Sequence, residues 1–160
     1  MIKLPILESA SVSVPCCTAD PEHPGCLIAH GVPDFPQGEV PVITSALSGG
    51  SFRTYLEQAS EGNRPVCLLL TPLCHFFRIP CPDGIGQPIS QEELCEMRKL
   101  ADWQYAPQLM CHYGYSRKEH WMILYDDDNT LQQKAAIAEE LNYAYLAASE
   151  ELIEKLRLPD

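Results

Sequence analysis

The residues best suited to chemistry are cysteines and histidines, and the first group of them lies in a proline-rich stretch near the N-terminus. Cys17, His23, Cys26 and His30 supply thiol and imidazole groups, the ligand types from which tetrahedral zinc sites are built. Their spacing matches no standard zinc motif, and cysteines without a metal pack as small apolar side chains. We therefore expect no cofactor, with zinc held by these four residues as the alternative.

A second pair, Cys74 and His75, directly follows an apolar run that is typical of a buried strand. Functional groups of α/β proteins often stand at strand ends, and a neighbouring imidazole activates a thiol for nucleophilic or redox chemistry. Residues adjacent in sequence seldom form such a pair, and Phe76 and Phe77 indicate that the segment folds back on the core. Cys74 and His75 are nevertheless the candidate catalytic residues.

The third candidate is the turn formed by Ser48, Gly49, Gly50 and Ser51. Glycines allow close backbone approach, and free amides at the start of the following helix can hold an anion. The turn lacks the lysine of a phosphate-binding P-loop. An ordinary strand-to-helix turn, in which Ser51 caps the helix, explains the same residues. The sequence leaves both interpretations open.

The elements that would carry these groups begin with a strand–helix–strand unit. Residues 40–47 are rich in β-branched side chains and predict a strand, and residues 52–60 carry apolar side chains on one helical face. Residues 66–71 form a continuous apolar run, typical of a strand buried on both faces. The unit should be parallel and right-handed. Residues 72–89, rich in proline and glycine, predict a long loop.

The rest of the chain predicts a helix, a hairpin and a last helix. Ser90 and Glu93 form a capping box at the start of a helix that runs to about residue 103. Residues 109–115 and 121–125 predict two strands joined as a hairpin by a polar turn.

The last predicted element is a long helix over residues 130–156, whose apolar residues recur three and four apart. At about 1.5 Å per residue it would be roughly 40 Å long, whereas the expected radius of gyration of the domain is about 15 Å. We therefore expect its far end to pack on a second copy, as a homodimer. The interface would include Tyr145, Leu152, Ile153 and Leu156.

Together these elements predict a single α/β domain: a βαβ unit followed by α-β-β-α, with a mixed sheet of about four or five strands and about three helices. This domain would span residues 40–160, with a proline-rich irregular arm at residues 1–39 packed on it. The order of elements, with Pro107 just before the hairpin, resembles that of thioredoxin-like domains. Where redox members of that family carry Cys-x-x-Cys, this chain has the turn at residues 48–51, so the resemblance implies architecture and no redox activity.

Composition and charge exclude several classes of partner. The chain has 22 acidic and 11 basic residues, a net charge of −11, which disfavours nucleic acid and anionic membrane surfaces. Residues 121–160 hold nine acidic and three basic residues, which favours a basic protein partner. No apolar run approaches the roughly 20 residues of a bilayer span. The N-terminus does not resemble a signal peptide, so we expect a cytoplasmic protein.

The function that these patterns predict is a cytoplasmic, acidic interaction or regulatory module without enzymatic activity. No set of nucleophile, base and acid stands at a recognisable spacing, and the overlong helix calls for a partner. The alternatives are a small metal-dependent or cysteine-dependent enzyme, or a thioredoxin-like redox protein. Either would have its site at the loop of residues 72–89 and the turn at residues 48–51.

Overall fold

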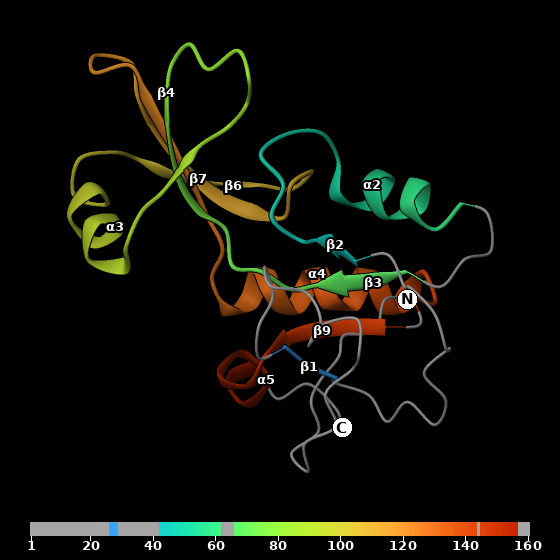
Figure 1. Ribbon diagram of the computed structural model, residues 1–160. Coiled ribbons are helices and arrows are strands. Elements are labelled where there is room, and N and C mark those ends of the chain that lie inside the picture. Colours follow the sequence, from blue (N-terminus) through green and yellow to red (C-terminus); the bar gives the residue numbers. More distant parts are fainter. Residues whose placement is uncertain (1–25, 29–41, 62–65, 144, 157–160) are drawn as a thin grey trace.

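The computed structural model describes residues 26–28, 42–61, 66–143 and 145–156, which form two β-sheets and four helices (Figure 1). None of the helices in these ranges is long and apolar enough to cross a membrane. In chain order the elements are β1 (Cys26–Ile28), β2 (Val42–Thr44), α2 (Phe52–Ala59), β3 (Cys67–Leu69), β4 (Cys74–Arg78), β5 (Gln87–Pro88), α3 (Gln91–Met97), β6 (Trp103–Ala106), β7 (Cys111–Ser116), β8 (Trp121–Tyr125), α4 (Asp128–Glu140), β9 (Tyr145–Ser149) and α5 (Glu150–Leu156).

The first sheet has the strand order β1-β9-β3-β2. Strands β2, β3 and β9 run parallel, and β1 is antiparallel to β9. β3 is buried along its whole length, as expected of a parallel strand covered on both faces. In Figure 1, α4 runs alongside β3 and β9. Its Leu131 shares a core with Phe52 and Leu56 of α2 and with Leu152 of α5.

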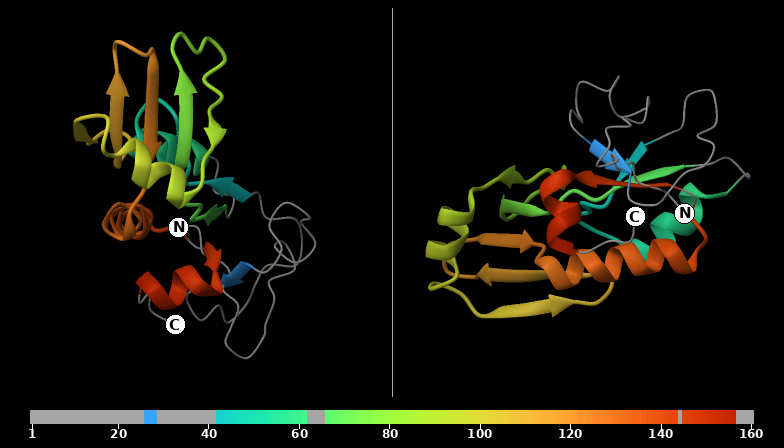
Figure 2. Two further views of the ribbon diagram at one scale, coloured as in Figure 1. Left: turned by 90° about the vertical axis from the view of Figure 1, so that its left-hand side faces the viewer. Right: turned by 90° about the horizontal axis from the view of Figure 1, so that it is seen from below.

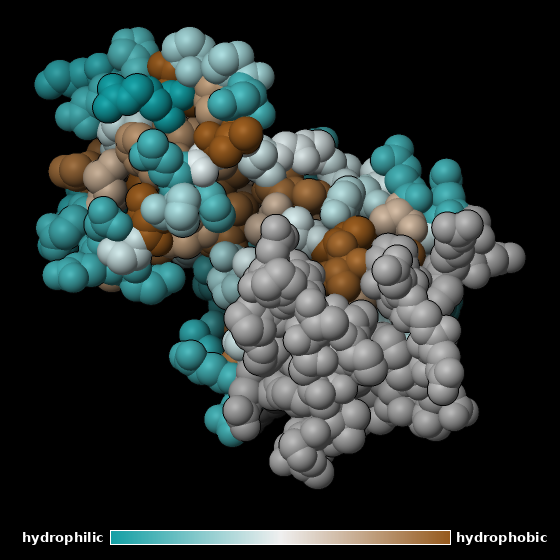
Figure 3. All heavy atoms as spheres, viewed as in Figure 1, coloured by the Kyte–Doolittle hydropathy of each residue, from teal (hydrophilic) through white to brown (hydrophobic). Residues whose placement is uncertain are grey.

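The second sheet is antiparallel, with the order β5-β4-β8-β7-β6. Successive side chains of a strand point to opposite faces, so the sheet has two different surfaces. On one surface, Trp121, Ile123 and Tyr125 of β8 are covered by α3 through Leu94. On the other, Phe77 is the largest side chain of a separate buried cluster. Figure 2 shows α3 lying beside this sheet, and in Figure 3 the outer edge of this part of the molecule is mostly hydrophilic, with hydrophobic residues further in.

The predictions that depend on short segments are confirmed. The α/β class holds, and the mixed sheet has four strands. Helix α2 lies within the predicted range and is capped by Ser51, and β2 pairs in parallel with β3. The capping box of α3 is present, with the Glu93 amide 3.1 Å from Ser90 Oγ and the Ser90 amide 2.7 Å from Glu93 Oε2. β7 and β8 form the predicted hairpin.

The predicted helix over residues 130–156 is wrong, because α4 ends at Glu140 and a strand and a second helix follow. Asn142 adopts a φ of 55°, the left-handed conformation that commonly follows a helix C-terminus. Leu146, Ala147 and Ala148 favour helices by intrinsic propensity. They lie instead in β9, buried between β1 and β3, so tertiary burial overrides the local preference.

The side chains of the predicted dimer interface belong to the core of their own chain. Tyr145, Leu152 and Leu156 are buried, and Ile153 is half-buried against the same cluster. The single long helix that motivated this interface does not form, so these residues present no exposed stripe. The homodimer itself stays a prediction, to be tested by the mass in solution.

The predicted loop of residues 72–89 contains β4 and β5. The helix predicted to run from Ser90 to about residue 103 ends at Met97, and Trp103 begins β6. Strand β4 pairs with β8 over five residues. Pro88 lies in the short edge strand β5, where a missing amide is tolerated. The hairpin therefore belongs to a second sheet, unlike the single mixed sheet expected from the thioredoxin-like order. Within the described residues, the cis peptide bond is the one between Ile79 and Pro80, and it does not involve Pro107, the proline on which the resemblance rested.

Candidate functional site

The structure separates Cys74 from His75. The two are consecutive in β4, so their side chains lie on opposite faces, and Cys74 packs on the α3 side. Burial raises the pKa of the Cys74 thiol, and the Glu93 carboxylate raises it further. Burial lowers the pKa of His75, whose buried Nδ1 has no hydrogen-bond partner. The two residues therefore do not form a nucleophile–base pair.

In the candidate anion site, both serine hydroxyls and the Phe52 amide already form hydrogen bonds inside the chain. Ser48 Oγ donates a hydrogen bond of 2.9 Å to the Gly84 carbonyl, and Ser51 Oγ caps α2. The amide of Phe52 donates to the Gln108 carbonyl at 2.8 Å. The geometry is that of a strand-to-helix connection.

Three of the four zinc candidates, Cys17, His23 and His30, lie outside the described residues. Cys26 begins β1. Within the part of the chain that the structure describes, no three His, Cys, Asp or Glu side chains gather as a group that could hold a metal ion. The zinc alternative stays a prediction.

The structure contains a buried ion pair that sequence analysis missed. Lys134 Nζ lies 2.8 Å from each carboxylate oxygen of Asp126 and donates to the Ser45 carbonyl at 3.1 Å. Asp126 also accepts hydrogen bonds from the Leu73 amide at 3.0 Å and the Thr130 hydroxyl at 2.9 Å. Both ion-pair side chains are 0% exposed.

This ion pair joins the two halves of the fold. Asp126 directly follows β8 of the second sheet, whereas Ser45 directly follows β2 of the first. Burial raises the pKa of Asp126, and the neighbouring Lys134 opposes that increase. The sequence contained a signal for this pair, because Lys134 lies on the helix face that carries the apolar Leu131 and Ala135. A cation buried on such a face needs an acidic partner. Since neither side chain reaches solvent, the pair holds the structure together and offers no accessible chemistry.

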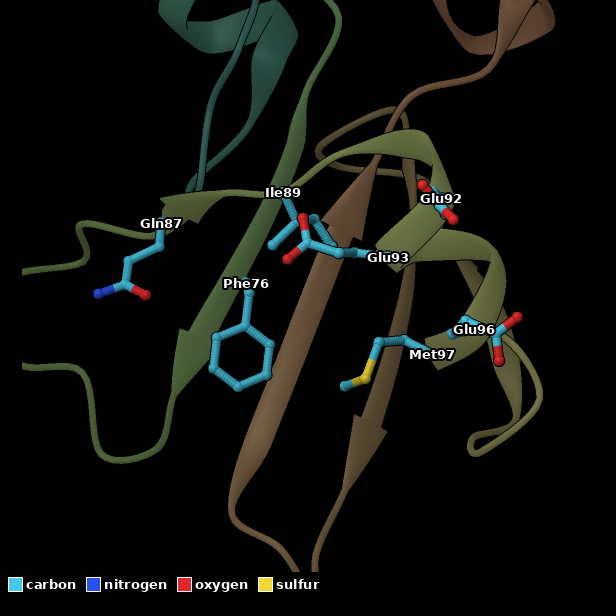
Figure 4. Close-up of a pocket in the computed structure, with 7 residues that line it drawn as sticks. All are labelled: Phe76, Gln87, Ile89, Glu92, Glu93, Glu96 and Met97. Carbon is cyan, nitrogen blue, oxygen red and sulfur yellow. The ribbon is translucent and has the colours of Figure 1, made fainter.

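An open hollow lies on the α3 side of the second sheet (Figure 4). Its volume is about 530 Å³, within the roughly 300–1,000 Å³ typical of ligand-binding clefts. Phe76 of β4, Ile89 after β5 and Met97 of α3 give it an apolar floor. In Figure 4, Phe76 and Met97 face each other across the hollow, while Gln87 points outward at its edge.

Three glutamates of α3, Glu92, Glu93 and Glu96, line the rim of this hollow. Hydrogen bonds from Ser90 lower the pKa of the Glu93 carboxyl, so that group stays ionised well below neutral pH. Glu96 forms an ion pair with Lys99, at 2.6 Å. The hollow therefore combines an apolar floor with a negatively charged rim.

A second hollow, of about 680 Å³, lies on the other side of α3, against the start of α4 and against α5. Its charges are mixed and partly paired. Lys155 forms an ion pair of 2.8 Å with Asp128, and the Arg98 guanidinium lies 5.3 Å from the centre of the Tyr125 ring. The second hollow therefore does not favour ligands of one charge, whereas the acidic rim of the first hollow favours cations.

No family model matches this chain, and no curated protein is significantly similar to it. Among the solved structures that match part of this chain are two bacterial proteins. One, a spore cortex-lytic enzyme, SleL, of Bacillus megaterium QM B1551, is 16% identical over 71% of this chain with a TM-score of 0.47. The other is described as a sporulation-specific glycosylase, ydhD, of Bacillus subtilis, and is 19% identical over 51% of this chain with a TM-score of 0.37. The matched region is 30% of each of those chains.

Proposed function

We propose that this chain is a non-enzymatic, cytoplasmic interaction module that docks a basic segment of a protein partner in the hollow beside α3. The observation that carries the proposal is the apolar floor under a rim of glutamates. Burial of an apolar side chain on the floor supplies most of the binding free energy. The carboxylates select lysine or arginine next to that side chain and repel acidic competitors.

The overall charge supports the same kind of partner. A net charge of −11 attracts a cationic protein before contact and speeds its approach. Exposed charges are screened over about 8–10 Å at physiological salt, so binding should weaken as ionic strength rises. Docking by the apolar floor alone would lack this salt dependence.

The enzymatic and redox alternatives have less support. Cys74 and His75 lie on opposite faces of the sheet, and burial disfavours the thiolate of Cys74. The Asp126–Lys134 pair is sealed from solvent. Neither set supplies an accessible nucleophile beside a base, as covalent catalysis requires.

The methionines of the chain provide a direct test. Of its four methionines, Met97 lines the hollow, whereas Met110 and Met122 pack against other clusters. Protein labelled with ¹³C at the methionine methyl groups would be titrated with a synthetic peptide of lysines flanking a leucine. We expect the Met97 methyl resonance to shift saturably while those of Met110 and Met122 stay in place.

Two controls make this titration decisive. A peptide with glutamates in place of the lysines should leave the Met97 resonance unchanged, because the rim repels it. Glu92→Gln should weaken binding of the lysine peptide several-fold, since it removes one rim charge and keeps the side-chain shape. Failure of the lysine peptide to shift Met97 at low ionic strength would refute the proposal.

A further inference from the structure

The three rim glutamates differ in what they already bind, and this difference bears on how a partner would be recognised. Glu93 accepts the Ser90 amide at 2.7 Å and completes the cap of α3. Glu96 is 2.6 Å from Lys99 Nζ. For Glu92, the described part of the chain contains neither a hydrogen bond nor an ion pair to its carboxylate.

The Glu96–Lys99 pair is easily opened. Its two side chains are 68% and 67% exposed, and exposed ion pairs of this kind are individually weak. Lys99 follows the end of α3, where its amide donates to the Glu96 carbonyl at 3.2 Å, so its backbone stays in place when the side chain swings away. Releasing the ammonium group requires no change in the fold.

We infer that Lys99 is a built-in competitor of the partner. Its ammonium group occupies the position beside the Glu96 carboxylate that a cation of the partner takes on binding. The inference rests on the proposed function and specifies its recognition. Glu92 and Glu96 lie one helical turn apart on α3, about 5–6 Å between their β-carbons. Glu92 is open to a first cation, and Glu96 receives a second after displacing Lys99. The partner is therefore a segment with at least two lysines or arginines beside the apolar side chain that enters the hollow.

This arrangement predicts that removal of a positive charge from Lys99 improves binding. In Lys99→Gln, the partner no longer competes with the Lys99 ammonium group for the Glu96 carboxylate. The affinity should rise about two- to fivefold, which corresponds to the free energy of one exposed ion pair. Binding would be measured by fluorescence anisotropy with the labelled lysine–leucine peptide at low ionic strength. Thermal melts by circular dichroism would confirm that each variant folds.

The matched control is Lys118→Gln, which removes the same charge from the exposed turn between β7 and β8. Lys118 does not line the hollow, so its replacement should change the affinity by much less than Lys99→Gln does. The second control repeats Lys99→Gln in a Glu96→Gln background. There the gain should vanish, because the carboxylate over which the two cations compete is gone.

The outcomes separate the inference from the proposed function. If the wild type binds the peptide and Lys99→Gln binds no better than Lys118→Gln, Lys99 is not a competitor, although the docking site stands. A gain that persists in the Glu96→Gln background would also overturn the inference, because it would arise from net charge alone. If no variant binds the peptide, the proposed function itself fails.

Discussion

Replacing Lys134 with methionine should lower the free energy of unfolding by about 3–5 kcal/mol, the usual effect of removing one partner from a buried ion pair. Lys134 Nζ donates to both oxygens of Asp126 and to the Ser45 carbonyl. Methionine has a similar length but no donor, so Asp126 keeps only its hydrogen bonds from Leu73 and Thr130. The loss is a large fraction of the roughly 5–15 kcal/mol that stabilises a typical domain.

The size of this loss should depend on pH. Burial raises the pKa of Asp126, and in Lys134→Met no neighbouring ammonium group opposes that effect. A carboxyl whose pKa is higher in the folded state than in the unfolded state stabilises the fold at low pH. That contribution is lost as pH rises through the folded-state pKa. Relative to the wild type, Lys134→Met should therefore be less destabilised at about pH 5 than at about pH 8.

Urea unfolding followed by tryptophan fluorescence and far-ultraviolet circular dichroism would measure the loss. Trp103 and Trp121 both lie in the second sheet, whereas circular dichroism reports on the whole fold. Lys118→Met is the control for loss of an exposed lysine. Adding Asp126→Asn to Lys134→Met should be less damaging than the sum of the single changes, with a coupling of about 0.5–3 kcal/mol. A cost below about 1 kcal/mol for Lys134→Met would refute the reasoning.

Three further predictions test other parts of the fold. Leu69→Ala truncates a core side chain of β3 that is 4% exposed and should cost about 2–5 kcal/mol in a denaturant melt; a change below about 0.5 kcal/mol would contradict its placement. In a thiol titration, the exposed Cys95 should react at once, whereas Cys111, buried with its pKa raised to about 11, should react only after unfolding. Because burial lowers the pKa of His75, its contribution to stability is present above about pH 6.5 and lost as pH falls. His75→Leu should therefore make melting temperatures less pH-dependent between about pH 7 and pH 5, and an unchanged profile would count against this role.

The features that the sequence predicted correctly are those set by residues close together in the chain. Ser90 and Glu93 form a capping box because the two groups are three residues apart and satisfy each other's backbone amides. Ser51 likewise caps α2. The apolar run containing Leu68 is buried in a parallel sheet because it lacks polar positions on either face. Each of these signals lies within one helical turn or one strand.

The features that the sequence did not predict depend on contacts between distant residues. β4 is a strand because it pairs with β8, whose first residue, Trp121, lies opposite Arg78. Nothing within a proline-rich segment indicates such a partner. Leu146 and Ala147 form a strand for the same reason, since β9 is inserted between β1 and β3. In both places, burial against distant strands decided the structure, and the local propensity did not.

The candidate site was not predicted from the sequence, because the net charge of a segment does not show where its charges lie in the fold. Residues 61–120 hold seven acidic and six basic residues, nearly neutral in total, whereas the largest acidic excess lies in residues 121–160. Yet the capping box fixes α3 so that Glu92, Glu93 and Glu96 line one hollow over Phe76. Of the nearby basic residues, Lys99 neutralises part of that rim through an exposed pair that is easily opened. A nearly neutral segment therefore presents a local negative surface, and the net charge of that surface depends on whether Lys99 stays paired with Glu96.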